Sequence, residues 1–477
     1  MDTVCSAASV SARHRSSPHW KRILLGLVKA ESSKPPSSIS PARSAAFEIL
    51  LRVAQEDAYA SELLHSARYA RLSTPDHGLA TELVMGVLRW QSRLDEQIAR
   101  ASSQPLRKLD LEVLIALRLG TYQLLWLERI PKHAAINESV ELVKKARKRS
   151  AAGFVNAVLR KLSASNRDSG TTQTRDPADL ASRLAHPEWL IKRWVAEFGV
   201  EGATRICEYD QHPPTTTIRL RDPNLQEELA NAGVGLSPGA LLSSARRVES
   251  GDITRTAAFR ERRITIQDEG SQLVAALVGT GSRILDCCCA PGGKTAILAE
   301  SNPHSSVVAV ELHPHRARLT RKLVPHGNVQ VISADSRALP LSGSFDRVLV
   351  DVPCSGTGTL ARNPEIKWRL KPGDLAELQS RQVAILTSAM DRLSAGGRIV
   401  YSSCSLEKEE NQDVIDRALK ERSGFRLIEV REELLKLRSG GELVWDDLDS
   451  LVDGPYLRTR PGTHPCDGFF AAIITTD

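Results

Sequence analysis

Two cysteines each follow a short apolar run that is typical of a buried strand. Cys354 comes after Val348-Leu349-Val350 and Cys404 after Ile399-Val400, and the stretch between them has a helical pattern. A strand–helix–strand unit within one sheet places its strands parallel, so both strands end at the same edge. We therefore predict that the two thiols lie together at the carboxyl edge of a sheet, where open α/β sheets bind their ligands.

The alternation of strand-like and helical patterns continues from Arg283 to the C-terminal part of the chain. It predicts a doubly wound, Rossmann-like α/β domain. We place this domain at residues 266–477, with strands near residues 284–286, 307–310, 329–332, 348–350 and 399–400.

The chain before this domain is helical at first and mixed afterwards. Apolar residues recur at helical spacing through residues 41–165, which predicts an all-α bundle. The segment 111–127 is apolar nearly all round, as expected of a central buried helix. Residues 166–185 are polar and predict a linker, and residues 186–265 predict a small α+β subdomain.

Composition bounds the remaining possibilities. Residues 1–40 are rich in Ser, Pro, Arg and Lys, which predicts a disordered tail. No run approaches the roughly 18 apolar residues of a membrane span. Three of the eight cysteines are consecutive, at 287–289, and no C-x-x-C pair occurs, so we expect neither a disulfide framework nor a bound metal. Free thiols indicate a reducing compartment, so we expect a cytoplasmic protein, and we expect a monomer.

A glycine-containing loop follows the first strand of the α/β domain. Its residues are Cys288, Cys289, Ala290, Pro291, Gly292, Gly293 and Lys294. Glycines let the backbone turn tightly and approach a ligand, and a helix is expected directly after them. The first glycine of a phosphate-binding P-loop is missing, which argues against an NTPase.

One carboxylate stands at or just after the end of each of the next three strands: Glu311, Asp335 and Asp351. Glu311 lies about 20 residues after the glycines, where nucleotide-binding sheets place the residue that accepts the ribose hydroxyls. Asp335 is placed to accept from an adenine amino group. Because no diphosphate-binding G-x-G-x-x-G is present, the ligand expected here contains adenosine without pyrophosphate. S-adenosylmethionine fits that description.

Two thiols beside a methyl donor suggest a specific reaction. Carbon 5 of a pyrimidine becomes nucleophilic when a thiolate adds to carbon 6, and a base must later remove the proton from carbon 5. Nucleophile and base must therefore approach the same ring. From the residues alone, either Cys354 or Cys404 could be the one that attacks.

These motifs resemble a known family. The loop 288–294, Asp351-Val352-Pro353-Cys354-Ser355 and Ser403-Cys404-Ser405 are similar to the motif set of RNA (cytosine-5)-methyltransferases. Cys289 stands where that family usually has Ala. The helical part resembles a NusB-like RNA-binding domain through stretches such as Asn156-Ala157-Val158-Leu159-Arg160. The two-domain combination is similar to the family members that methylate small-subunit (16S) ribosomal RNA.

The resemblance implies a role for each central residue. Cys404 would be the nucleophile on carbon 6, Cys354 would assist elimination and release, and Asp351 would hold the cytosine near the cofactor. The loop residues, together with Glu311, Asp335 and Asp351, would line the S-adenosylmethionine site. A tRNA substrate remains an alternative, as does a non-catalytic RNA-binding assembly factor that uses only the NusB-like domain.

Two sets of cations are candidates for RNA contacts, and the net charge of +7 favours such a partner. One is the run Lys144, Lys145, Arg147, Lys148 and Arg149, which could bind phosphates or could be a solvated helix end. The other is Lys367, in Asn363-Pro364-Glu365-Ile366-Lys367-Trp368, a stretch that matches the family after the Cys354 motif and would shape the RNA entrance. The subdomain at 186–265 is also expected to contact RNA.

Overall fold

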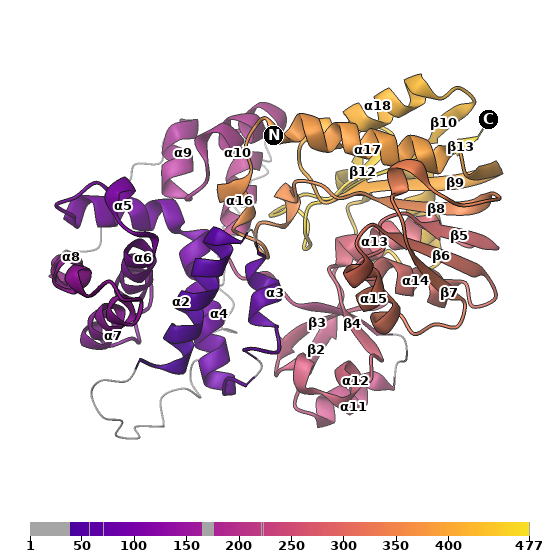
Figure 1. Cartoon of the computed structure of the whole chain (residues 1–477). Coiled ribbons are helices and arrows are strands. Elements are labelled where there is room, and N and C mark those ends of the chain that lie inside the picture. The colour runs from indigo at the N-terminus through magenta and orange to yellow at the C-terminus, as the bar shows by residue number, and fades with distance from the viewer. Residues whose placement is uncertain are drawn as a thin grey trace, which may run out of the picture. The chain divides into compact units, whose positions relative to one another are not determined.

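The computed structural model describes residues 39–56, 58–69, 71–164, 176–220, 222 and 224–476 (Figure 1). Residues 1–38 of the expected tail lie outside the described residues. So do residues 165–175, which include the first half of the expected linker. Within the described part of the chain, no helix is both long enough and apolar enough to cross a membrane.

The first domain is entirely helical, as predicted. Ser40 caps its first helix by accepting a hydrogen bond from the backbone N–H of Arg43. Helix α6 contacts five other helices of the domain, which explains why its sequence is apolar nearly all round. The helices are α2 (Pro41–Gln55), α3 (Ala60–Leu64), α4 (Thr74–Arg89), α5 (Gln91–Ala101), α6 (Leu111–Leu125), α7 (Lys132–Lys145) and α8 (Ala152–Ala164).

Helix α9 (Pro177–Arg183) forms inside the segment that was expected to be a linker. Asp176 caps it by accepting from the backbone N–H of Ala178 at 3.1 Å, and Pro177 occupies the first turn. Both features start helices. The linker prediction is therefore wrong from residue 177 onward, because a polar composition concealed a short capped helix.

The long helix α10 (Glu188–Asp210) is kinked at Gly199, where φ is 71°. Apolar side chains of α9 and α10 pack against Leu360, Ile366 and Leu406 of the α/β domain. The predicted α+β unit consequently begins later than residue 186. The expected boundary at residue 186 was wrong because α10 packs against the α/β domain, and no local sequence pattern reveals that contact.

A four-stranded antiparallel sheet with the order β2-β3-β1-β4 follows α10. Its strands are β1 (Thr217–Leu220), β2 (Gly235–Pro238), β3 (Ala245–Ser250) and β4 (Ile264–Ile266). Helices α11 (Leu225–Asn231) and α12 (Ala257–Arg260) complete this unit, whose core contains Ile218, Leu229 and Ile264.

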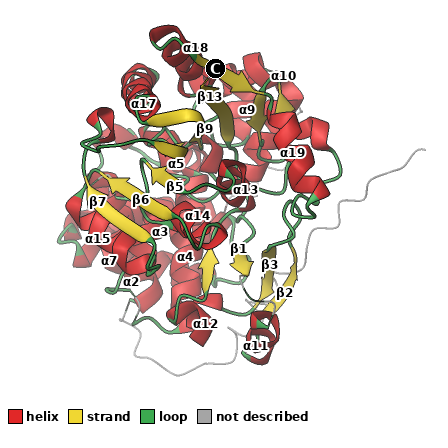
Figure 2. Cartoon of the chain, turned by 90° about the vertical axis from the view of Figure 1, so that its right-hand side faces the viewer, coloured by secondary structure: helices red, strands yellow, loops and turns green. Residues whose placement is uncertain are grey.

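The large sheet has a parallel centre with the order β9-β8-β5-β6-β7. Strand β13 adds antiparallel to β9, and β10 and β12 both pair with β13. This is the predicted Rossmann-like sheet with an antiparallel edge (Figure 2). The strands are β5 (Arg283–Asp286), β6 (Ser306–Glu311), β7 (Val329–Ser333), β8 (Phe345–Asp351), β9 (Leu393–Ser403), β10 (Phe425–Ile428), β11 (Val452–Asp453), β12 (Tyr456–Arg458) and β13 (Phe470–Thr476).

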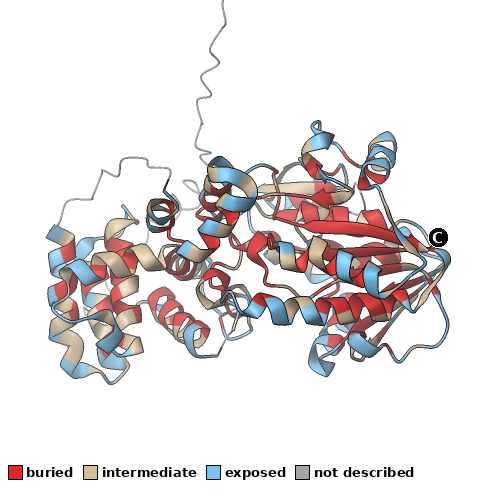
Figure 3. Ribbon diagram, turned by 90° about the horizontal axis from the view of Figure 1, so that it is seen from above, coloured by how far each residue is buried: buried red, intermediate tan, exposed pale blue. Residues whose placement is uncertain are grey.

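Helices cover both faces of this sheet, so its central strands are buried on both sides (Figure 3). Leu349 packs toward α13 (Glu269–Val278) and α14 (Gly293–Ser301), while its neighbours Val348 and Val350 pack toward α17 (Asp374–Met390) and α18 (Gln412–Glu421). This alternation is the period of two expected of a strand. Helices α15 (Pro314–Leu323), α16 (Ile366–Arg369) and α19 (Val430–Ser439) complete the domain.

Lys367 lies in α16 and caps the C-terminus of α4. Its ammonium group donates to the Arg89 carbonyl at 3.1 Å, and the indole N–H of Trp368 donates to the Leu88 carbonyl at 2.6 Å. The last carbonyls of a helix lack partners and carry negative partial charge, so a cation there is favourable. Lys367 is only 1% exposed, and burial lowers its pKa to about 7. The prediction that Lys367 contacts RNA is therefore wrong.

Replacing Lys367 by Met tests this structural role. The stem volume is kept, but the α4 carbonyl and the nearby Asp210 carboxylate lose their cation. We expect the free energy of unfolding to fall by about 1–3 kcal/mol in urea titrations. RNA affinity of the folded variant should equal that of the wild type. A variant of unchanged stability that binds RNA more weakly would restore the original interpretation.

Candidate active site

The two cysteines meet as predicted. Strands β8 and β9 are parallel, with Asp351 opposite Ser402, and the Sγ atoms of Cys354 and Cys404 lie 3.2 Å apart just beyond the strand ends. The backbone N–H of Gly358 donates to the Cys404 carbonyl at 2.9 Å. A Cβ at that glycine would lie 2.3 Å from the Gly468 carbonyl oxygen, so only glycine permits this approach. Both thiols are free and partly exposed.

The thiol pair is electrostatically asymmetric. The hydrogen bond with Cys404 and burial together raise the pKa of Cys354 well above its usual value. Cys354 therefore holds its proton more tightly than an ordinary thiol. Two sulfur atoms within hydrogen-bonding distance are what a nucleophile with an adjacent helper requires.

Asp351, at the end of β8, has both oxygens held. Oδ2 accepts from the Lys294 ammonium at 2.8 Å and Oδ1 accepts from the Ser402 hydroxyl at 2.7 Å. Lys294 lies 5.1 Å from the centre of the Phe469 ring, and the Asp351 charge raises its pKa against the opposing effect of burial. The carboxylate is thus held in one orientation at the end of β8, three residues before Cys354, and Lys294 connects it to the glycine loop.

Asp286, at the end of β5, organises that loop, although the sequence did not single it out. Its Oδ1 accepts from the Cys288 N–H at 3.3 Å and its Oδ2 from the Thr295 hydroxyl at 2.7 Å, so it joins the two ends of the loop. Burial raises the pKa of Asp286 to about 6. A carboxylate at the end of the first strand was a visible signal, because the later strand ends also carry one.

The loop itself divides into exposed and packing residues. Gly292 has φ 114°, a conformation that favours glycine, and directly precedes α14. Cys288 is partly exposed. The side chain of Cys289 instead packs with Ala309, Ala317 and Val331, so it fills space beneath the loop rather than facing a ligand. Both Cys and the Ala that the family usually has at this position are small enough to fill this space.

The carboxylates of the next two strands reach the same edge with different surroundings. Glu311 ends β6, is 6% exposed, and accepts from the His313 N–H at 2.9 Å through Oε1. Asp335 follows β7 and is half-exposed, and Arg337 bonds both of its oxygens, which lowers its pKa. One oxygen of Glu311 is therefore available to accept a hydrogen bond from a ligand. Both oxygens of Asp335 already accept from Arg337, so a ligand could use only the lone pairs that Arg337 leaves.

Gln267 is a second residue that the sequence did not single out. Its Oε1 is buried and has no hydrogen-bond partner in the described part of the chain, and it lies 3.6 Å from where a Cβ on Gly293 would stand. Its Nε2 already donates to Ser271 at 3.0 Å. An unpaired buried acceptor beside the helix start fits a ligand that brings a donor to this loop.

The basic run on α7 and after it is only partly available. Lys144 pairs with Glu141 at 2.7 Å and Lys148 pairs with Asp110 at 3.0 Å. Lys145 donates to the Ser44 hydroxyl at 2.7 Å. Arg147 and Arg149 are exposed, and among the described residues neither side chain has a partner. The structure therefore leaves two free guanidinium groups from a run of five cations.

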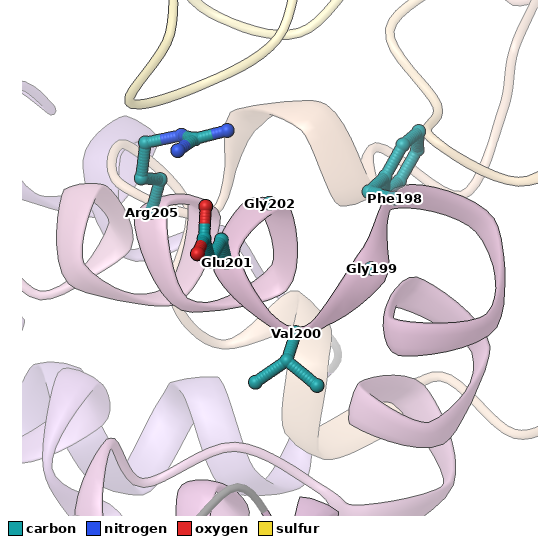
Figure 4. A pocket seen from close by; sticks show the side chains of 6 residues that line it. All are labelled: Phe198, Gly199, Val200, Glu201, Gly202 and Arg205. Atoms are coloured by element: carbon teal, nitrogen blue, oxygen red, sulfur yellow. The ribbon is translucent and has the colours of Figure 1, made fainter.

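Other features contribute nothing to this site. A pocket at the kink of α10, lined by residues 198–202 and Arg205, shares no residue with the cysteine or glycine loops (Figure 4). The described residues hold no group of three or more His, Cys, Asp or Glu side chains that could bind a metal ion.

Replacing Asp286 by Asn should change how stability depends on pH. Because the folded pKa of about 6 exceeds the ordinary 3.8, the folded state binds the proton more tightly, and ionisation costs stability as pH rises between these values. Asn removes that cost. The unfolding free energy of the variant minus that of the wild type should therefore increase by up to about 3 kcal/mol from pH 4 to 6. If denaturant titrations gave the same difference in unfolding free energy between the variant and the wild type at every pH, the raised pKa of Asp286 would be contradicted.

Comparison with known proteins agrees with this geometry. A family model described as 16S rRNA methyltransferase RsmB/F matches residues 277–475, and a NusB family model matches residues 40–164. The crystal structure of PH0851 has a TM-score of 0.75 and covers 94% of this chain and 100% of that chain at 21% identity, which shows a shared fold.

Two curated relatives extend over most of the chain. A probable ribosomal RNA small subunit methyltransferase B of Bacillus subtilis is 35% identical over 398 residues, with 80% of this chain and 89% of the relative covered. A ribosomal RNA small subunit methyltransferase B of Pseudomonas syringae is 36% identical over 374 residues, with 74% and 81% covered. The chain belongs to the RsmB/F family of 16S rRNA methyltransferases.

Proposed function

We propose that this protein methylates carbon 5 of one cytosine in small-subunit ribosomal RNA through a covalent adduct at Cys404. The observation that carries the proposal is the pair of sulfur atoms 3.2 Å apart, beside the oriented carboxylate of Asp351. Carbon 5 chemistry needs two groups at one ring, and this site supplies them.

S-adenosylmethionine supplies the methyl group when it is bound. The loop 288–294 would hold it at the start of α14, where backbone N–H groups and the positive end of the helix face a carboxylate. Glu311 would accept the ribose hydroxyls, and Asp335 would accept from the adenine amino group through its free lone pairs. The unpaired Gln267 Oε1 would accept from an ammonium group.

In the first step the Cys404 thiolate forms a bond to carbon 6 of the cytosine, which places an electron pair at carbon 5. Asp351 would accept a hydrogen bond from the amino group of the base. After methylation, carbon 5 carries both a methyl group and a proton. Removal of that proton reforms the ring double bond, breaks the sulfur–carbon bond and regenerates the thiolate.

Cys354 is suited to the second half of this sequence. The largest cause of its raised pKa is the hydrogen bond with Cys404. Once Cys404 is a thioether it no longer shares that hydrogen bond in the same way, while burial continues to raise the pKa of Cys354. Cys354 lies 3.2 Å from the sulfur of the adduct, so it is placed to assist the elimination that releases the product.

The partner and setting follow from the same features. Relatives over most of the chain are named as ribosomal small-subunit enzymes, which favours rRNA over tRNA. The intact thiol pair disfavours a purely structural assembly factor. Free cysteines suit the reducing cytoplasm, and we propose that the protein acts there as a monomer. Arg147 and Arg149 are our candidates for phosphate contacts on the helical domain.

Cysteine variants test the chemistry. With unmodified small-subunit rRNA and labelled S-adenosylmethionine, Cys404→Ala should lose methyl transfer by roughly 10³-fold or more, because the nucleophile is gone. Cys354→Ala should accumulate a protein–RNA adduct that survives denaturing electrophoresis. Cys207→Ala, which removes a buried thiol from α10, serves as the control. Methyl transfer by Cys404→Ala at the wild-type rate would refute the mechanism, and methylation of tRNA alone would change the substrate.

A double replacement of Arg147 and Arg149 by Ala tests the RNA surface. Removing two phosphate contacts should reduce the slope of log affinity against log salt by about 1.4 to 1.8. The matched control is Arg417→Ala with Arg422→Ala, which removes the same charge but from arginines paired with Glu421 and Asp391. Equal slopes in both double variants would show that residues 147 and 149 do not contact RNA.

A further inference from the structure

Glu410 is a buried carboxylate that contacts both cysteine loops. It closes a short 3-10 helix, η7 (Lys408–Glu410), and its exposed fraction is 0%. Its Oε1 accepts from the backbone N–H of Ser355 at 2.8 Å, and its Oε2 accepts from the hydroxyl of Ser405 at 2.5 Å. Ser355 is the residue after Cys354, and Ser405 is the residue after Cys404.

Both oxygens of the Glu410 carboxylate are fully hydrogen-bonded. The hydroxyl of Ser355 also donates to Oε2, and the side-chain N–H of Gln382 donates to Oε1 at 2.8 Å. Gln382 reaches the Cys354 loop a second time, through the Pro353 carbonyl at 3.0 Å. Burying a carboxylate without a cation is costly unless its oxygens are fully hydrogen-bonded. Four donors on two oxygens meet that condition.

The two serine hydroxyls lie next to each other, with their oxygens 3.0 Å apart, and each gives its single proton to Glu410. The Ser405 oxygen also accepts from the backbone N–H of Glu407 at 3.0 Å, within the Cys404 loop. The Thr357 hydroxyl accepts from the Leu406 N–H at 2.9 Å, which joins the two loops. Glu410 is the acceptor that both cysteine loops share.

Other buried glutamates near the site have different partners. Glu407 accepts from the Trp194 indole at 3.0 Å and from Arg193, which anchors α10. Glu365 accepts from the Ala60 N–H at 2.7 Å in the helical domain. In the described part of the chain, Glu410 alone among these three bonds to residues adjacent to both reacting thiols.

We propose that Glu410 is a positioning residue, which holds the Cys354 and Cys404 sulfur atoms at the separation that adduct formation and release require. This rests on the proposed thiol mechanism. Strand pairing aligns β8 and β9 only as far as Asp351 and Ser402. Beyond the strand ends, single hydrogen bonds such as that from the Gly358 N–H to the Cys404 carbonyl connect the loops, and Glu410 adds a carboxylate that accepts from the residue after each cysteine.

The charge of Glu410 adds a second effect. It contributes to the raised pKa of Cys354, after the hydrogen bond with Cys404 and burial. Among titratable groups, Cys404 and Glu410 raise the pKa of Cys354, and the Tyr401 and Tyr59 side chains are also within electrostatic reach of this thiol. Replacement by Gln keeps an acceptor for Ser355 and Gln382 and places an amide opposite the serine hydroxyls, which can turn to accept. Gln thus preserves positioning while removing the charge.

The kinetic test compares Glu410→Ala, Glu410→Gln and wild type. We expect Glu410→Ala to lower kcat by roughly 10- to 100-fold, because small misplacements of reacting groups have effects of that size. The KM for rRNA and the affinity for S-adenosylmethionine should stay within about twofold, and Glu410→Gln should recover most of kcat. The control is Glu433→Gln, a buried glutamate of α19 paired with Arg398, which should retain wild-type kcat.

A thiol-trapping test separates this proposal from the proposed reaction. Phenylarsine oxide bridges two adjacent thiols, forming two arsenic–sulfur bonds and releasing one water. Bridging of Cys354 to Cys404, located by peptide mapping, should be fast in the wild type and in Glu410→Gln. It should be slower in Glu410→Ala by roughly the factor lost in kcat. Cys404→Ala controls for other cysteines.

The outcomes are distinct. Slower bridging in Glu410→Ala supports positioning even where rRNA proves not to be the substrate. Wild-type bridging and kcat in Glu410→Ala would overturn it. The proposal would also be overturned if Glu410→Ala lowered kcat and Glu410→Gln lowered it as much. The same holds if the control Glu433→Gln lowered kcat to a similar extent. Should Glu410→Ala fail to fold, Glu410→Asp gives the same comparison, because a shorter carboxylate cannot reach both loops and should slow bridging.

Discussion

The parallel pairing of β8 with β9 is the constraint on which the active site depends. Five consecutive residues of β8, from Arg347 to Asp351, pair with residues 398–402 of β9. Because the pairing is in register up to the strand ends, both chains leave the sheet at the same edge, and a cysteine follows each within three residues. Strand order therefore brings the two cysteine loops to one edge, and the contacts beyond the strands set the separation of the sulfur atoms.

Three hydrogen-bonded carboxylates then convert this edge into an ordered site. Asp286 joins the two ends of the glycine loop, and Asp351 is held between Lys294 and Ser402. Glu410 connects the cysteine loops. Each acts through hydrogen bonds to side chains or backbone N–H groups, which orient more strictly than apolar contacts do. The sheet brings the segments together, and these three residues determine where their ends point.

The fold was largely predictable because the spacing of apolar residues along the sequence identifies helices and strands. The helical pattern of the first domain and the alternation after Arg283 are local signals, and both were confirmed. Glu410 was missed and Lys367 was misinterpreted because each has partners distant in the sequence, whereas Asp286 has near partners and its strand-end position was a visible signal. Asp286 and Glu410 look like ordinary strand-end and turn carboxylates, and Lys367 looks like an exposed cation beside a motif. Only the fold reveals that Lys367 meets the end of α4, some 280 positions earlier.

The contact between α16 and α4 also explains how the helical domain and the cysteine site are connected. The segment after Cys354 first bonds to the Cys404 carbonyl through Gly358. Within about ten further residues it places Glu365 against the first turn of α3, Lys367 and Trp368 against the end of α4, and Arg369 against carbonyls before α3. A segment of about ten residues therefore contacts both the Cys404 loop and the ends of α3 and α4, so the same stretch of chain that follows Cys354 also packs against the helical domain.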